Sequence, residues 1–324
     1  MERKLNKTKF VRYGMLLVAA FFWGMAFVVQ ATDKIPPFTF TAVRSLIGAA
    51  VLFPVAILMD KGKVRRGEKA ILPADEKKKA FRTLLIGGLC CGAVLTCATN
   101  LQQFGMSLNL EAGKAGFITA MYIVLVPFLG LLTGKKSGIV MWISVLIAVA
   151  GLYFICVKGA FRINKGDICL IACAFAFAGH ITVVDHFTNV TDGVKLSAMQ
   201  FVFCGLFSLA ASLIFEFGKI SFSELLAFYP SFLYMGICSC GIAYTFQILG
   251  QKGTNPTAAS LIMSFESCFS LLGGVLFLGE RLTPREWIGF ALMVVAIVLT
   301  ETKELFEKAP TPESKPVSSE NKPV

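Results

Sequence analysis

Long apolar runs alternate with short polar segments along almost the whole chain, from Val11 to Thr300. Each run has about 18 or more residues with few charges, which is the length that a helix needs to cross a hydrocarbon core of about 30 Å. We count ten such runs, and they predict an all-α integral membrane protein with ten transmembrane helices. The predicted spans are 11–31, 38–59, 83–106, 115–133, 139–157, 167–187, 196–215, 231–251, 257–278 and 285–301.

The composition agrees with a membrane protein. The chain is 56% hydrophobic and 16% charged, whereas ordinary soluble domains have about 25% charged residues. No separate soluble domain is expected, because the connections are short. The region 1–10 is predicted to be a cytoplasmic N-terminus, 158–166 an extracytoplasmic linker, and 302–324 a disordered cytoplasmic tail.

The basic residues predict the orientation of the protein. If the N-terminus is cytoplasmic, 22 of the 31 Lys and Arg residues lie on the inner side and eight on the outer side, with Arg44 inside the second span. The excess of positive charge on the inner side predicts that both termini lie on the cytoplasmic side of the cell membrane. The net charge of +11 is then a signal of topology beside anionic lipid headgroups, and nucleic-acid binding is not expected.

The second half of the chain repeats the first. An offset of 144 residues aligns Gln103 with Gln247 and Ile118 with Ile262, and an offset of 155 aligns Phe22-x-Gly24 with Phe177-x-Gly179. The predicted repeats, 11–157 and 167–301, contain five spans each, and an odd number of spans inverts the second copy in the membrane. Inverted repeats place a binding site near the midplane and provide a route to alternating access.

Several motifs connect the chain to a known family. They are Trp23-Gly24, Arg44, Pro127, Glu266, Gly279-Glu280-Arg281-Leu282-Thr283 and Trp287-Ile288-Gly289. With these motifs the chain resembles the EamA-type, ten-helix members of the drug/metabolite transporter superfamily. The resemblance implies a secondary carrier of small metabolites, most often an exporter, with a central cavity. Family members often have proline after the glutamate of the ninth helix, where this chain has Ser267.

Glu266 is the first candidate for chemistry. It lies nine residues beyond Thr257, which is about 14 Å deep and close to the centre of the hydrocarbon core. A carboxylate at that depth is costly, so it should be protonated, paired or exposed to a water-filled cavity. Two interpretations stay open: Glu266 contacts substrate or a coupling proton, or it makes a structural hydrogen bond in every state.

Trp23 and His180 are two further candidates inside the membrane. Trp23 lies about 15 Å deep, although membrane tryptophans usually lie at the interfaces. It could form a cavity wall for an apolar or aromatic substrate, or simply pack beside Gly24. His180 could change its charge near neutral pH, but a single membrane histidine is also typical of a hydrogen-bonded packing residue.

Arg44 and a set of neutral polar residues complete the candidate site. Arg44 is near enough to the outer end of its span to anchor the helix at the interface, and if it faces the cavity it would favour a carboxylate-bearing substrate. The neutral groups lie on helices that the family uses for its cavity. They are Asn100, Gln103, Tyr122, Tyr244 and Gln247.

Other functional classes have little support. The ten cysteines lie in apolar spans, where cysteine behaves as a small hydrophobic residue, and no metal or cofactor site is expected. No Gly-x-x-x-x-Gly-Lys-[Ser/Thr] phosphate-binding loop is present. The sequence therefore predicts a secondary active transporter of amino acids or related metabolites, an exporter or exchanger in which proton coupling is one option. The alternatives are a multidrug exporter of cationic aromatic compounds and, in a different class, an intramembrane enzyme; the assembly is expected to be a monomer or homodimer.

Overall fold

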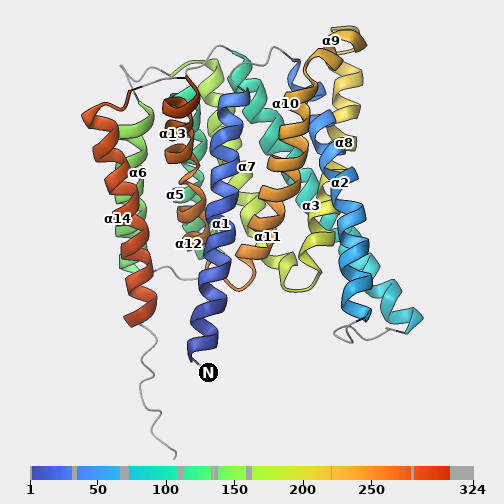
Figure 1. The fold of residues 1–324 in the computed structure, drawn as a ribbon, viewed down its shortest axis with the longest axis horizontal. Coiled ribbons are helices and arrows are strands. Elements are labelled where there is room, and N and C mark those ends of the chain that lie inside the picture. The colour runs from blue at the N-terminus through green and yellow to red at the C-terminus, as the bar shows by residue number, and fades with distance from the viewer. Residues whose placement is uncertain are drawn as a thin grey trace, which may run out of the picture.

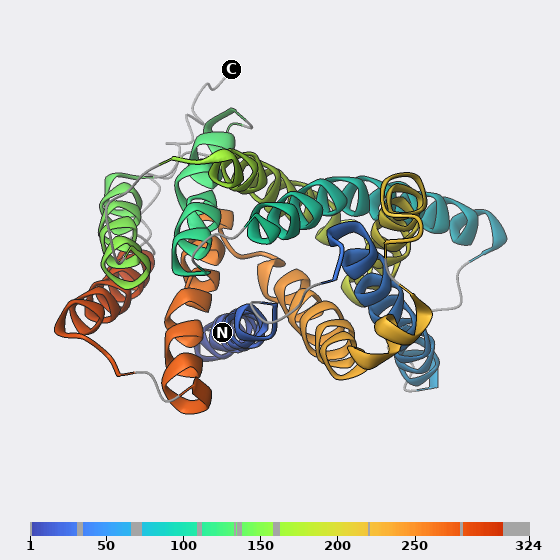
Figure 2. The same cartoon turned by 90° about the horizontal axis from the view of Figure 1, so that it is seen from above.

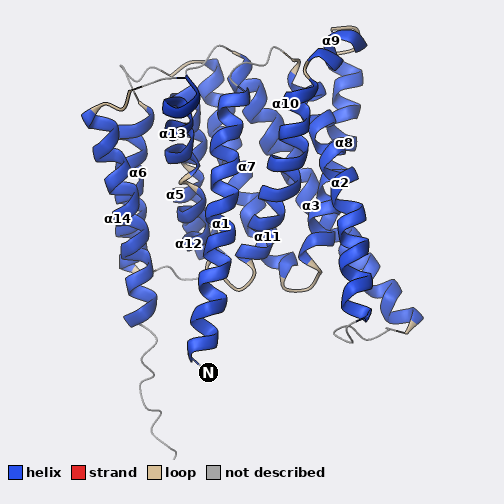
Figure 3. Ribbon diagram, viewed as in Figure 1, coloured by secondary structure: helices blue, strands red, loops and turns tan. Residues whose placement is uncertain are grey.

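The structure, a computed structural model, describes residues 2–30, 35–65, 73–108, 112–132, 134, 138–157, 163–219, 221–278 and 281–306. Within these residues the secondary structure is helical, with no strand, and the helices stand side by side in one bundle (Figures 1, 2 and 3). The first half of the bundle contains α1 (Glu2–Gln30), α2 (Pro37–Arg65), α3 (Ala74–Ser107), α4 (Ala112–Ala120), α5 (Tyr122–Leu132) and α6 (Ile139–Cys156). The second half contains α7 (Lys165–Thr188), α8 (Gly193–Phe215), α9 (Phe222–Ala227), α10 (Tyr229–Leu233), the π-helix η1 (Tyr234–Ala243), α11 (Tyr244–Gln251), α12 (Pro256–Met263), α13 (Glu266–Leu278) and α14 (Pro284–Phe306).

The chain is a multi-pass membrane protein, because eight helical stretches within the described residues are long and apolar enough to cross a bilayer. They correspond to the first eight predicted spans. The last two predicted spans coincide with α12–α13 and α14, which do not meet that length and composition, so the count of ten stays a prediction. Helix also extends beyond the predicted ends, since α1 already begins at Glu2.

Three of the predicted spans are not regular α-helices. The predicted helix 115–133 is interrupted at Met121, and the predicted helix 257–278 is interrupted at Ser264 and Phe265. The predicted helix 231–251 contains the ten-residue π-helix η1, and π-helical segments are frequent at functional sites. The periodicity of apolar residues could not indicate these interruptions, because apolar residues occur on all sides of such a helix.

Helix ends within the bundle carry the caps that their sequences predict. α14 begins at Pro284, and Thr283 and Glu286 form a reciprocal pair: the Thr283 N–H donates to the Glu286 carboxylate at 2.8 Å, and the Glu286 N–H donates to the Thr283 hydroxyl at 3.3 Å. Thr283 therefore caps α14, and Pro284 is its first residue. Gly279 and Glu280 of the same motif lie outside the described residues.

Two ends of the bundle are useful reference points. We call the end that holds the start of α1 and the turn between α7 and α8 the N-terminal face, and the end that holds α9 and the start of α14 the opposite face (Figure 1). Polar contacts clamp α2 to α8 at both ends. At the N-terminal face Lys195 pairs with Asp60, and at the opposite face the Glu216 carboxylate accepts from the N–H groups of Phe38 at 3.0 Å and Thr39 at 2.7 Å.

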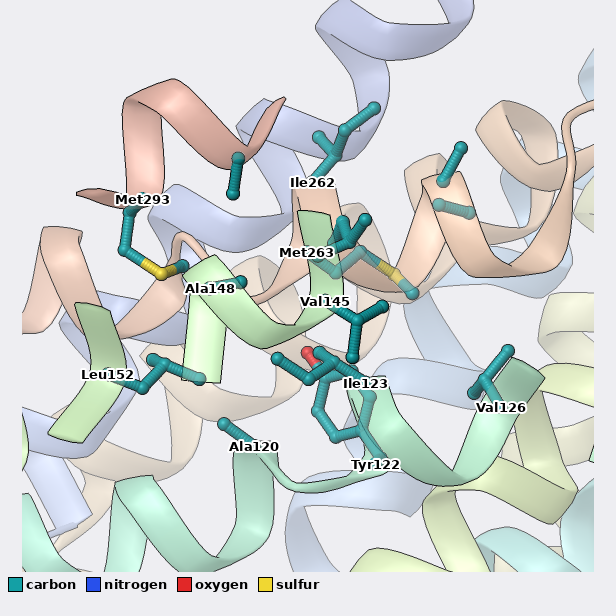
Figure 4. Close-up of a cluster of buried hydrophobic side chains, with 14 of the residues drawn as sticks. Ala120, Tyr122, Ile123, Val126, Val145, Ala148, Leu152, Ile262, Met263 and Met293 are labelled. Carbon is teal, nitrogen blue, oxygen red and sulfur yellow. The ribbon is translucent and has the colours of Figure 1, made fainter. Parts of the chain in front are cut away.

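The largest buried apolar cluster joins helices from both halves of the chain. It contains Ile123 and Val126 of α5, Val145 and Leu152 of α6, and Met293 of α14, with residues of α12 packed against them (Figure 4). Burial of such side chains contributes about 1.5–3 kcal/mol each relative to exposure in water. This cluster holds α4–α5 and α12–α13 side by side, and the candidate site lies where these two interrupted helices meet.

Candidate functional site

Glu266 stands at the interruption between α12 and α13, where it is the first residue of α13. The hydrogen-bond pattern changes just before it, because the Phe265 N–H donates to Ile262 O at 3.2 Å and the Ser267 N–H donates to Ser264 O at 3.2 Å. Both bonds span three residues instead of four, which tightens the helix locally. The Glu266 side chain is only 7% exposed and points into a cavity between the helices.

Tyr122 occupies the corresponding position at the other interruption, as the first residue of α5. It lies 144 residues before Glu266, which is the offset of the internal repeat. The Tyr122 hydroxyl hydrogen-bonds with the Glu266 carboxyl group, and both groups line the cavity. The two interruptions therefore bring their first residues into contact, and the buried carboxyl has a partner from the other half of the chain.

Gly24 of α1 sets the distance between α1 and the start of α13. A methyl group at Gly24 would lie 2.6 Å from the carbonyl oxygen of Glu266, 2.6 Å from Cβ of Phe269 and 2.8 Å from the backbone nitrogen of Ser270. Two of these three atoms belong to the backbone and cannot rotate away. A side chain at this position would push α13 outward, so Gly24 fixes the position of Glu266 in the cavity.

Aromatic rings form the walls of the cavity. Trp23 contacts Tyr244 edge to face, with ring centroids 4.8 Å apart, and Tyr122 lies 6.4 Å from Phe177. All four residues line the cavity. Edge-to-face aromatic pairs are rigid and contribute about 0.5–1.5 kcal/mol beyond their buried area, so they form a preorganised apolar surface. The Trp23 indole N–H has no hydrogen-bond partner among the described residues.

Arg44 of α2 supplies a buried cation to the same cavity. Its side chain is 4% exposed, its guanidinium lies over the Phe40 ring at 5.4 Å, and its Nε–H has no partner among the described residues. The interpretation of Arg44 as an interfacial anchor does not fit this burial. A buried guanidinium is costly without an anionic or carbonyl partner, and a bound ligand could provide one.

The cavity is lined by fifteen residues from both halves of the chain, and its empty space, including the part open to solvent, is about 570 Å³. Three polar lining residues lie toward the opposite face: Gln30 at the end of α1, Arg44 near the start of α2 and Gln102 near the end of α3. The lining residues are Trp23, Ala26, Phe27, Gln30, Arg44, Gln102, Thr119, Tyr122, Phe177, Ile181, Ser239, Tyr244, Gln247, Met263 and Glu266.

Six of the nine predicted site residues meet at this cavity, and three do not line it. Gln103 is buried, and its neighbour Gln102 lines the cavity in its place. Asn100 donates a hydrogen bond to the Ser208 hydroxyl at 2.8 Å, and His180 forms a 3.1 Å hydrogen bond with Gln200. Both bonds lie between helices, so these two side chains join α3 and α7 to α8.

Sequence reasoning missed several lining residues, including Gln30, Thr119, Phe177 and Ser239. Phe177 could have been found, because it is one of the residues that the internal repeat aligns. The others gave no signal: hydroxyl side chains are common in buried helices, and their direction depends on how each helix is rotated. Thr119 and Ser239 lie close to an interrupted or π-helical segment, whose rotation the sequence does not reveal.

Comparison with known protein families gives a match over nearly the whole chain. The profile of the EamA-like transporter family matches residues 12–157 and 164–302. The two matches divide the chain into segments close to the two predicted repeats. They also include every residue that lines the cavity.

Individual proteins resemble the chain over similar lengths. An uncharacterized transporter of Archaeoglobus fulgidus is 28% identical, covering 92% of this chain and 87% of its own length. The uncharacterized transporter YwfM of Bacillus subtilis is 25% identical over 88% and 91%, and the uncharacterized inner membrane transporter YedA of Escherichia coli is 23% identical over 92% and 93%. A crystal structure of another protein has the same fold, with a TM-score of 0.72 at 16% identity over 92% of this chain and 99% of that one.

Proposed function

The chain belongs to the EamA-like transporter family and is a membrane transporter, and from this premise we propose that it moves zwitterionic small metabolites, amino acids or related compounds. The observation that carries the proposal is the presence of a guanidinium and a carboxyl group in one aromatic-walled cavity. Arg44 can bind a carboxylate through two parallel hydrogen bonds, and Glu266 can accept from an ammonium group. The rings between them suit an apolar or aromatic side chain.

Tyr244 lines the same cavity as Arg44 and Glu266, and its ring forms the wall against Trp23. A ligand that lies along this wall would place opposite charges at its two ends. The arrangement favours a molecule with both charges over a molecule with only one, because a singly charged ligand would leave the other buried group unpaired.

We propose further that transport follows alternating access, with export or exchange as its direction. The lining residues Gln30, Arg44 and Gln102 lie toward the opposite face, which the basic-residue pattern predicts to be outside the cell, while both termini are proposed to lie in the cytoplasm at the cell membrane. Glu266 can release an ammonium group when it is protonated, which would couple transport to a proton gradient. Monomer and homodimer are both compatible with this mechanism.

Two alternatives give different expectations. A multidrug exporter of cationic aromatic compounds would use the rings and Glu266, but the buried Arg44 would repel a cation. An intramembrane enzyme would need a nucleophile with a base at one depth. The cavity lining within the described residues contains neither cysteine nor histidine, and relatives that resemble the chain over most of its length carry the name of transporter, so we propose a non-enzymatic function.

Exchange in proteoliposomes tests the proposal with three ligands of one shape. Vesicles loaded with L-phenylalanine should take up labelled L-phenylalanine, but neither phenethylamine, which lacks the carboxylate, nor hydrocinnamate, which lacks the ammonium group. Arg44→Gln should reduce the exchange at least tenfold, whereas Arg82→Gln on the exposed end of α3 should leave it unchanged. Transport of phenethylamine but not L-phenylalanine would support the cationic alternative, and no exchange of any amino acid would refute the proposal.

A further inference from the structure

Two helix crossings in the bundle are copies of one contact. A methyl group at Gly92 of α3 would lie 2.7 Å from Gln200 O and 2.6 Å from Cβ of Phe203 on α8. A methyl group at Gly236 of η1 would lie 3.2 Å from Arg44 O and 2.6 Å from Cβ of Ile47 on α2.

The residue numbers show that the two crossings correspond through the internal repeat. Gly92 and Gly236 are 144 residues apart, the offset of the repeat in this region. Gln200 and Phe203 each lie 156 residues beyond Arg44 and Ile47. Gln200 of α8 is therefore the counterpart of Arg44 of α2 in the second half of the chain.

The two counterparts differ in their access to the cavity. Arg44 lines the cavity and lies near the opposite face, seven residues after the start of α2. Gln200 is fully buried and lies closer to the N-terminal face, seven residues after the start of α8, which is about 10 Å along the helix. If the two inverted repeats exchange their conformations, Gln200 would come to line a cavity and Arg44 would become enclosed.

The surroundings of Gln200 are more polar than helix packing requires. Its Oε1 lies 3.1 Å from Nε2 of His180, and both side chains are 0% exposed. The amide nitrogen of Gln200 and Nδ1 of His180 have no partner among the described residues, and a buried polar group without a partner is unfavourable. The Ser197 hydroxyl accepts from Thr245 at 2.9 Å about one turn nearer to the N-terminal face.

This polar group lies directly behind the cavity wall. The His180 ring contacts the Tyr244 ring edge to face, with centroids 6.0 Å apart, and Tyr244 lines the cavity. We propose that Gln200 and His180 line a second vestibule, which opens toward the N-terminal face in the alternate conformation, and that they bind the carboxylate of the substrate there in place of Arg44. This inference rests on the proposed function, because it names the substrate contacts of its second state.

The cavity and the proposed second vestibule differ in the groups that bind the carboxylate. Arg44 offers a permanent charge and two parallel donors, whereas Gln200 and His180 offer neutral donors to the same carboxylate. Hydrogen bonds to a charged group from a guanidinium are stronger than those from neutral donors. The carboxylate is therefore bound more weakly in the vestibule at the N-terminal face than in the cavity at the opposite face.

Access of a membrane-impermeant thiol reagent to introduced cysteines tests the vestibule. The parent is the full chain with its ten cysteines replaced by alanine or serine, shown first to exchange L-phenylalanine. Gln200→Cys and the more conservative Ser197→Cys should react only from the N-terminal face, and saturating L-phenylalanine should change the rate at least threefold. Arg44→Cys should react only from the opposite face, and Val145→Cys in the apolar cluster should not react at all.

The outcomes separate the inference from the proposed function. Reaction at positions 200 and 197 from the N-terminal face, with protection or acceleration by substrate, supports the vestibule. Failure of both cysteines to react from either side, or reaction from the opposite face, overturns it even if the variants still exchange L-phenylalanine. A parent that is folded but exchanges no amino acid counts against the proposed function instead.

Discussion

The two interrupted helices, α4–α5 and α12–α13, have the same architecture but different chemistry. Each interruption is followed by a side chain that enters the cavity, Tyr122 in the first half and Glu266 in the second. In α5 a proline, Pro127, removes a backbone donor five residues beyond Tyr122. In α12–α13 the proline, Pro256, stands at the start of α12 and away from the interruption, where the Ser264 hydroxyl donates to Leu261 O.

This difference shows how a duplicated fold can acquire one specialised position. The backbone of both copies presents its first residue after the interruption to the same point of the cavity. Only one copy carries a carboxyl group there, and the other copy supplies a hydroxyl that hydrogen-bonds with it. The repeat therefore determines where the chemistry lies, and the divergence between the copies determines what that chemistry is.

Glu266→Gln gives the largest expected effect, because it removes the carboxyl group that distinguishes the second copy from the first. Loss of a charge-assisted contact to an ammonium group of about 3 kcal/mol corresponds to a decrease of about a hundredfold in exchange. In the wild type an acidic exterior should accelerate efflux of L-phenylalanine, and in the variant it should not. The measurement is efflux from proteoliposomes with and without an imposed pH gradient.

The comparison of efflux with and without the pH gradient decides whether Glu266 couples transport to protons. If Glu266→Gln retains the full acceleration by an acidic exterior, Glu266 does not carry the proton. Its role is then structural or limited to substrate binding, and the two copies are chemically closer than their sequences suggest.

Gly24→Ala should have the second-largest effect, because it moves the carboxyl without changing it. The new methyl group would meet the backbone of α13 at Glu266 and Ser270, and overpacking of this kind costs about 1–3 kcal/mol. We expect a lower thermal unfolding temperature and weaker exchange. Gly14→Ala in the same helix is the matched control, since no atom lies within 4 Å of its new methyl group.

Equal effects of the two alanine substitutions would contradict the proposed close packing. The loss would then come from the helical backbone of α1 itself. A difference confined to Gly24→Ala would show that α1 positions the start of α13.

Tyr122→Phe should have a smaller effect, because it keeps the ring and removes only the hydroxyl. The lost hydrogen bond to Glu266 contributes about 1.5 kcal/mol, or about tenfold in exchange. The ring contact with Phe177 should be retained. Tyr153→Phe in α6, which does not line the cavity, serves as the control; equal losses in both variants would mean that the Tyr122 hydroxyl has no special role.

The first eight membrane-spanning segments were predictable from the sequence, because their signals are long and additive. Runs of apolar residues indicate spans regardless of how the helices pack. The interruptions were not predictable, because Met121 and Phe265 look like any other apolar residue in such a run. Their positions follow from hydrogen bonds that form only when the two halves of the chain pack together.

Within the cavity, an unusual depth in the membrane was a better guide than polarity. Trp23 and Glu266 stand out because each is unusual at its depth, and the structure brings both to the cavity together with Arg44. Neutral side chains gave a weaker signal, since Gln102 and Gln103 are adjacent and only the rotation of α3 decides which one lines the cavity. His180 is as unusual as Glu266, yet it lies behind the wall.

Ser264→Ala should have the smallest effect, and it tests how an interruption forms without proline. In a regular helix the Phe265 N–H would bond to Leu261 O, but here it bonds to Ile262 O, and the Ser264 hydroxyl donates to Leu261 O at 2.7 Å instead. The alanine variant leaves that carbonyl group unpaired, which should lower stability by about 1 kcal/mol. Ser144→Ala is the matched control, because Ser144 donates to Val140 O at 3.0 Å in the uninterrupted α6, where the carbonyl can retain its backbone bond. A loss of stability and exchange in Ser264→Ala alone would show that the serine maintains the interruption, whereas no difference between the two variants would mean that packing between the halves is sufficient.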